Sequence, residues 1–168
     1  YGFFRMCYPM LPAGAQRWAF ALGVLGVIGI VYGAFVAMAQ SDFKRLVAYS
    51  SVSHMGFVLL GLSGYTAVGL SGAYFQTFSH GILTGALFLL VGVLYDRTHT
   101  RDLDSFGGLG ARVPVYTGLL VLFSFGSLGL PGMSGFIAEF FALLGAWENQ
   151  TTLVIIAVLG IVITAAFM

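Results

Sequence analysis

The sequence predicts an all-α protein, a polytopic bundle of transmembrane helices in which one helix is interrupted. Hydrophobic residues make up 59% of the 168 residues and charged residues only 8%, whereas a soluble domain carries about 25% charged residues. The apolar residues form stretches of roughly 20 or more, the length that an α-helix needs to cross a bilayer. One stretch, residues 113–147, is too long for a single straight span and contains Pro131 between glycines.

The first two spans are predicted at residues 18–40 and 43–62. Residues 18–40 carry no charge and contain four glycines spaced three or four residues apart, which allows a neighbouring membrane helix to approach closely. Near the start of residues 43–62 lies Lys44, the only lysine of the sequence. Asp42, directly before them, suits the N-cap of a helix.

The third span is predicted at residues 68–95, which are numerous enough for a tilted or kinked helix. A polar loop follows at residues 96–112, and the last span is predicted at residues 152–168. We interpret residues 1–168 as a single transmembrane domain. Because both ends resemble parts of helices, we expect the chain to be a piece of a longer membrane protein.

Residues 113–147 are interpreted as one helix that is interrupted near residues 129–135. Pro131 lacks the backbone N–H that a helix needs, and Gly129 and Gly132 loosen the backbone beside it. Such a break is tolerated at membrane depth only where protein or a water-filled cavity surrounds it. The sequence therefore predicts that this break is enclosed in the same way.

The charges in the loops predict the orientation of the bundle. The basic residues of the two loops on one face are Lys44, Arg45, Arg97, Arg101 and Arg112. The opposite face has Arg17, and Arg5 near the start of the sequence. By the positive-inside rule, the first face is the cytoplasmic face or its organellar equivalent.

Composition and motifs argue against several classes of function. The net charge of +1 argues against a nucleic-acid-binding surface, and the single cysteine, Cys7, excludes a disulfide within the chain. The sequence contains no cysteine cluster, no facing histidine pair for haem and no dinucleotide fingerprint. Arg97, His99 and Arg101 form a loop cluster without thiols, which we interpret as solvated or facing a partner, and we predict no metal site.

Three ionisable groups are predicted at membrane depth. At about 1.5 Å per helical residue, His54 lies roughly 15 Å inward from Lys44, near the bilayer centre. His80 is roughly 18 Å from one end of its span, and Glu139, just beyond the break, is also near mid-depth. Three helices therefore each bring one titratable group to about the same level.

These three groups indicate proton handling. Histidine titrates near neutral pH and both donates and accepts hydrogen bonds. A charged glutamate at the centre of a span costs about 3 kcal/mol on insertion scales, so it is rarely found there without a function. The alternative is a packing role, in which each histidine bonds to a serine or a carbonyl and the polar groups only fix the arrangement of the helices.

The polar residues nearby also have two interpretations. Ser50 and Ser51 lie four and three residues before His54, on the same helical face. With Ser79, they would hold hydrogen bonds or water along a proton path, or they would bond back to their own helices. Lys44, at the membrane edge, is either an anchor to the headgroups or one end of that path.

Three motifs carry a likeness to a known family. In order along the sequence they are AQSDFKRLVAYSSVSHMGFVLLG, SHGILTGALFLLVGVLYDRTHTRDLDSFGGL and LGLPGMSGFIAEF. They resemble the antiporter-like membrane subunit M of respiratory complex I, NADH-quinone oxidoreductase, which has counterparts in the mitochondrial complex, where it is called chain 4, and in the photosynthetic one. The alternative is the corresponding subunit of a multisubunit Na⁺/H⁺ antiporter, or a subunit of a membrane-bound hydrogenase.

The resemblance implies an antiporter-like fold of two repeats, each with an interrupted helix, and this chain resembles the second half. It also implies a proton relay. Lys44 matches the lysine of a D-x-K-[RK] element, His54 the histidine of SHMG and His80 that of SHG. Glu139 matches the carboxylate that follows the proline–glycine break, and Arg101 matches a basic loop position near the membrane surface.

The resemblance further implies a proton-translocating subunit of a redox-driven pump, a translocase without an electron-transfer site of its own. No cofactor is expected in this chain, whereas NADH, FMN, iron–sulfur clusters and quinone are expected in partner subunits. The implied partners are other membrane-arm subunits, including neighbouring antiporter-like subunits, and membrane lipid, with no nucleic acid. The implied location is a bacterial plasma membrane, or an organellar inner or thylakoid membrane, in which the protein is multi-pass.

Overall fold

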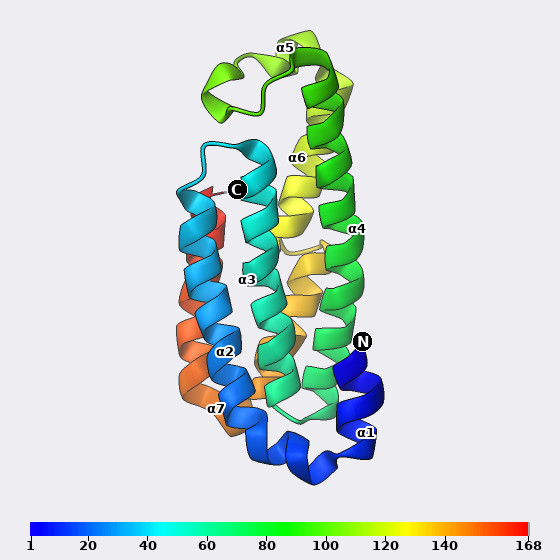
Figure 1. The fold of residues 1–168 in the computed structure, drawn as a ribbon, viewed down its shortest axis with the longest axis vertical. Helices are drawn as coiled ribbons and strands as arrows, with labels where there is room; N and C mark the ends of the chain where they lie inside the picture. The colour runs from blue at the N-terminus through cyan, green and yellow to red at the C-terminus, as the bar shows by residue number, and fades with distance from the viewer. Residues whose placement is uncertain (168) are drawn as a thin grey trace.

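The structure, a computed structural model, describes residues 1–167. Its long helices lie side by side along one axis and form an elongated bundle (Figure 1). The helices of this bundle are α2 (Pro12–Met38), α3 (Phe43–Ser63), α4 (Ala67–Thr98), α6 (Pro114–Leu128) and α7 (Ser134–Phe167). The predicted fold class is confirmed, because the elements of residues 1–167 are helical and α2, α3 and α4 are each long and apolar enough to cross a membrane.

Shorter elements precede and connect these helices. A π-helical turn (Phe3–Cys7) and α1 (Tyr8–Met10) lead into α2 at one end of the bundle. The polar loop after α4 contains a 3₁₀ turn (Leu103–Ser105) and α5 (Leu109–Arg112) at the other end (Figure 1).

Side-chain caps fix where two of the long helices begin. The Asp42 carboxylate accepts a hydrogen bond from the Arg45 backbone N–H at 3.0 Å, so the predicted N-cap of α3 is confirmed. Thr66 caps α4 in the same way, through the backbone N–H of Gly69 at 3.1 Å. These caps satisfy backbone N–H groups in the first turns of α3 and α4.

Glycines bring the backbones of α2 and α3 together. A Cβ atom added at Gly26 would lie 2.8 Å from the Gly56 carbonyl oxygen, and one added at Gly33 would lie 2.8 Å from the Ser53 backbone nitrogen. The predicted close approach along the glycines of α2 is therefore confirmed.

The chain reverses direction within α7. Gln150 has non-helical angles (φ −144°, ψ 40°), and the two arms on either side of it run in opposite directions (Figure 1). The first arm packs against α3 and α4, with Gly145 against Gly69. The second arm packs against α2, where Val154 and Ala157 join a core cluster with Ile30.

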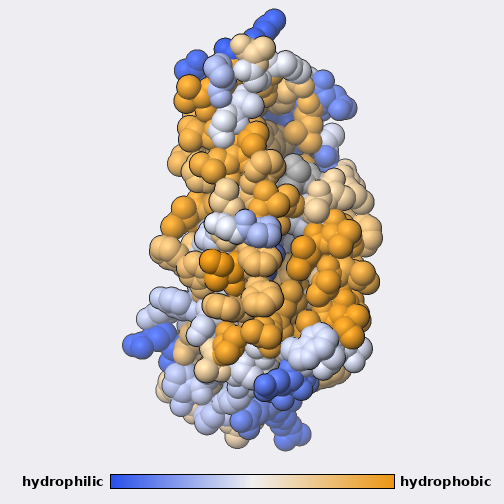
Figure 2. Space-filling view, turned by 180° about the vertical axis from the view of Figure 1, so that it is seen from behind, coloured by the Kyte–Doolittle hydropathy of each residue, from blue (hydrophilic) through white to orange (hydrophobic). Residues whose placement is uncertain are grey.

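The surface matches a membrane environment. Hydrophobic side chains cover the middle of the face seen in Figure 2, and hydrophilic ones gather toward both ends. Phe20, Leu89, Val115 and Leu159 are among the large apolar side chains that are more than half exposed. The loop from α2 to α3 and the loop from α4 to α6 lie at the same end (Figure 1). This end carries Lys44 and Arg97, in agreement with the grouping of loop charges predicted from the sequence.

Candidate functional site

A buried histidine and a buried glutamate are in contact at the centre of the bundle. His54 of α3 lies with its Nδ1 atom 3.1 Å from Oε1 of Glu139, in the first arm of α7. Only 2% of His54 and 5% of Glu139 is exposed. Among the described residues, no lysine or arginine forms an ion pair with Glu139. His54 is therefore the partner that offsets the cost of burying this carboxyl group.

The second ring nitrogen of His54 also has a partner. Nε2 lies 3.1 Å from the Ser127 hydroxyl, in the last turn of α6. When Glu139 is ionised it can only accept a hydrogen bond, so Nδ1 of His54 carries a proton. When Glu139 is protonated it donates to Nδ1, and Nε2 of the neutral ring then donates to Ser127. The ring can therefore take up a proton at one nitrogen and release one at the other.

His80 of α4 lies beside this pair without a direct hydrogen bond to it among the described residues. The rings of His54 and His80 have centroids 5.3 Å apart and are tilted by 44°. The Thr84 hydroxyl lies 3.0 Å from Nδ1 of His80 and 3.3 Å from Nε2. The structure thus gathers all three predicted titratable groups, but it leaves a gap between the two histidines.

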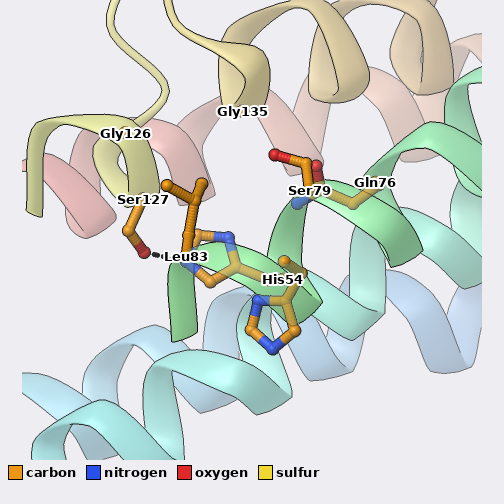
Figure 3. A pocket seen from close by; sticks show the side chains of 8 residues that line it. His54, Gln76, Ser79, Leu83, Gly126, Ser127 and Gly135 are labelled. Atoms are coloured by element: carbon orange, nitrogen blue, oxygen red, sulfur yellow. Dashed lines mark hydrogen bonds between the residues drawn. The ribbon is translucent and has the colours of Figure 1, made fainter. Parts of the chain in front are cut away.

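A small cavity borders both rings. Its volume is about 10 Å³, and its polar lining includes His54, Gln76, Ser79, His80 and Ser127 (Figure 3). A space of about 10–15 Å³ is enough for one water molecule. Ser79 does not bond back to its own helix, because its hydroxyl lies 2.7 Å from that of Ser134.

The interruption between α6 and α7 lies directly against Glu139. Gly129 and Gly132 have positive φ angles of 74° and 96°, and Pro131 lies between them. A Cβ atom added at Gly129 would lie 3.0 Å from Oε2 of Glu139. The break thus lets the end of α6 and the start of α7 approach His54 from two directions.

Lys44 lies apart from this centre. It is exposed at the start of α3 and lines a separate cavity of about 340 Å³ with Tyr95 and Arg101. Ser50 and Ser51 both donate to the Val47 carbonyl oxygen, at 2.9 and 3.2 Å. Of the two predicted roles, these serines therefore have the one in which they bond back to their own helix, α3.

The loop cluster is at the same end as Lys44. Arg97 and His99 are not buried, and the Arg101 guanidinium lies 4.7 Å from the centre of the Tyr95 ring. The backbone of this loop pairs with the start of α3, because the Phe43 N–H donates to the Arg101 carbonyl at 2.8 Å. The loop cluster therefore joins the loop after α4 to the start of α3, at the end of the bundle away from the histidines.

Two residues of the centre were not predicted from the sequence. Gln76 lies four residues before His80 on α4, and its Nε2 donates to Oε1 of Glu139 at 3.5 Å. Ser127 lies just before the helix break. The spacing of four residues from His80 was a signal for Gln76, whereas Ser127 had none beyond its closeness to Gly129.

Comparison with known proteins shows which family this chain resembles. The family described as NADH:quinone oxidoreductase/Mrp antiporter, TM, matches residues 1–164. NADH-quinone oxidoreductase subunit M of Rhodobacter capsulatus is 46% identical over 167 residues, which are 99% of this chain and 33% of that protein. The chain therefore spans about a third of the length of this relative.

Two solved structures have the same fold. A chain of respiratory complex I from Thermus thermophilus with bound NADH superposes with a TM-score of 0.94 at 39% identity, over 99% of this chain and 36% of that one. A chain of the Mrp complex from Dietzia sp. DQ12-45-1b superposes with a TM-score of 0.89 at 25% identity, over 95% and 30% of the two chains.

Proposed function

The chain belongs to the NADH:quinone oxidoreductase/Mrp antiporter family of transmembrane proteins, and from this premise we propose that it relays protons inside the membrane as part of a redox-driven pump. The subunit M relative and the complex I structure support this proposal over the alternatives. The partners would be the other membrane subunits of such a complex and the surrounding lipid. NADH, FMN, iron–sulfur clusters and quinone would belong to partner subunits, and this chain would need no cofactor.

The observation that carries the proposal is the buried contact of His54 with Glu139. A carboxyl group and an imidazole in contact exchange a proton without moving the backbone, since each group is donor in one state and acceptor in the other. Ser127 gives the second nitrogen of His54 an outlet. The packing alternative assigns the same contacts to hydrogen-bond satisfaction alone, so the effect of substituting Glu139 separates the two interpretations.

In this proposal the relay runs through Glu139, His54 and His80 at the centre of the bundle. Lys44 would be an end of the path at the basic end of the bundle, reached from His54 along about three turns of α3. Because Ser50 and Ser51 bond back to Val47, this last stretch would depend on water rather than on serine hydroxyls.

The test replaces Glu139 in the full-length protein within its assembled complex. Glu139→Gln keeps the shape of the side chain and removes its exchangeable carboxyl proton. The loss of an acid–base group costs about 10²-fold in rate, so we expect proton translocation to fall at least tenfold. Protons moved per electron are measured together with electron-transfer activity. Glu148→Gln, an exposed glutamate in the same helix, is the matched control and should pump normally. Normal pumping by assembled Glu139→Gln complex would refute the relay.

A second candidate is sodium/proton antiport without a redox partner. The likeness to a chain of the Mrp complex favours it, because this chain superposes on that one nearly as well as on the complex I chain. Membranes containing the full-length protein would then exchange protons for sodium in the absence of NADH. Proton movement that requires electron transfer and is independent of sodium would support the pump.

A further inference from the structure

We infer that Gln76 is a positioning residue that orients Glu139 and holds one water molecule between His54 and His80, an inference that rests on the proposed relay. Gln76 is 3% exposed and lies on α4, one turn before His80. Its two amide atoms face different parts of the site. The amide nitrogen donates to the Glu139 carboxyl group, and the amide oxygen has no hydrogen-bond partner among residues 1–167.

The amide nitrogen of Gln76 fixes the carboxyl group. Nε2 lies 3.5 Å from Oε1 of Glu139, the same oxygen that contacts Nδ1 of His54. Two donors on one oxygen hold the plane of the carboxyl group toward the histidine. The other oxygen, Oε2, lies against Gly129, where a side chain would crowd it. The contacts to Oε1 therefore restrict rotation of the carboxyl group, and the missing side chain at Gly129 leaves room for Oε2.

The amide oxygen of Gln76 faces a space without a protein donor. Oε1 is buried and has no hydrogen-bond partner among the described residues, and a buried acceptor left in this state costs about 1–3 kcal/mol. Gln76 also lines the cavity of about 10 Å³. That volume is sufficient for one water. A water there would donate to Oε1 and relieve this cost.

The same water would link the two histidines through Ser127, whose hydroxyl contacts Nε2 of His54 and lines the cavity together with His80. Both ring nitrogens of His54 are already engaged, and no hydrogen bond joins its ring to that of His80 within residues 1–167. The cavity is lined by both rings and by the Ser79 and Ser127 hydroxyls, as Figure 3 shows for His54, Ser79 and Ser127. A water in this space has the two to four polar partners that buried waters need. Gln76 therefore determines whether His80 takes part in the relay.

The first test is a structure of the complete complex at a resolution that shows ordered water. One water should lie within hydrogen-bonding distance of Oε1 of Gln76, and it should be absent in Gln76→Met, which keeps the length of the side chain but removes both polar atoms. A dry cavity in the unmodified complex would overturn the inference. It would leave the Glu139 proposal standing, because that proposal is tested by Glu139→Gln alone.

The second test reads out the carboxyl group itself. The infrared carboxylate stretch of ionised Glu139, identified by its loss in Glu139→Gln, should shift in Gln76→Met because the amide donor to Oε1 is gone. Proton translocation should fall about three- to tenfold, as expected for the loss of one or two hydrogen bonds. Thr77→Val is the matched control, since the Thr77 hydroxyl donates to the Ala73 carbonyl of its own helix. An unshifted band together with normal pumping in Gln76→Met would overturn the inference, even where Glu139→Gln abolishes pumping.

Discussion

At the scale of single residues, the centre of the bundle is organised around the two nitrogens of one imidazole. Nδ1 of His54 contacts Glu139 and Nε2 contacts Ser127, both at 3.1 Å. The His54 ring joins α7 to the last turn of α6 through two hydrogen bonds whose protons are exchangeable. A side chain with one polar atom at this position would not connect the two helices.

Ser127→Ala tests the outlet from Nε2. The substitution removes the hydroxyl and leaves Nε2 without its partner, a loss of about 1 kcal/mol or more. We expect proton translocation to fall about tenfold while electron transfer in partner subunits continues. The measurement is the number of protons moved per electron. Ser124→Ala, one turn earlier in α6, is the control, and an equal decrease in both variants would argue against a specific role of Ser127.

The sequence predicted the titratable residues of the centre better than its neutral polar ones. Counting residues along predicted helices placed His54, His80 and Glu139 at one level, and the structure brings them together. Gln76 and Ser127 were missed because an uncharged side chain in a membrane helix carries little energetic signal. Whether it faces a partner or its own backbone depends on rotamers, which only packing determines.

At the scale of elements, the interruption between α6 and α7 creates the site. A continuous helix over these residues would project Ser127 and Glu139 from one straight rod. Gly129 at φ 74° ends α6, and after Met133 the backbone starts a new helix at Ser134. Two helix ends thereby meet beside His54.

Gly129→Ala tests this element. A side chain at a positive φ costs about 1–2 kcal/mol, and the new methyl group would also press on Oε2 of Glu139. We expect a lower midpoint of thermal unfolding for the full-length protein and slower proton translocation. Gly118→Ala, in the helical part of α6 with open space around it, should instead be neutral or stabilising by about 0.5–1 kcal/mol. Equal stability of the two variants would contradict the role assigned to Gly129.

Other features of the elements followed only from packing. Residues 148–151 separate two predicted spans, but their residue types do not predict how sharply the backbone turns. In the structure Gln150 makes the turn, and its amide donates to the Ser63 carbonyl at 3.1 Å, which ties α7 to the end of α3. That contact joins residues 87 positions apart and has no local signature.

At the scale of the whole molecule, charge and hydropathy determine how the bundle lies in the membrane. Lys44, Arg97, Arg101 and Arg112 lie at one end, and the apolar middle separates them from the end where Glu148 lies. The prediction of a transmembrane helix bundle rests on this composition together with the lengths of the apolar stretches. The side of the membrane that each end faces stays a prediction from the loop charges.

Accessibility to a membrane-impermeant thiol reagent tests the orientation. Cys7→Ser removes the only cysteine of these 168 residues, and any cysteine elsewhere in the full-length protein is replaced in the same way. Single cysteines are then placed by Arg97→Cys and Glu148→Cys, both at exposed positions. In the full-length protein, the cysteine at position 97 should react from the cytoplasmic side, or its organellar equivalent, because the positive face stays there. The cysteine at position 148 should react from the other side. The reverse pattern would invert the assignment.

The small cavity between the histidines also has an electrical consequence. A membrane that stores energy as a voltage must not leak ions, yet a proton pathway needs some polar passage through its low-dielectric core. A space of about 10 Å³ holds about one water, too little for an ion that travels with its hydration shell. In the proposed relay, protons would cross by exchange between neighbouring groups, whereas a hydrated ion would not fit in this space. Under the proposed relay, the packing around His54 and His80 would let the bundle pass protons while it holds back larger ions.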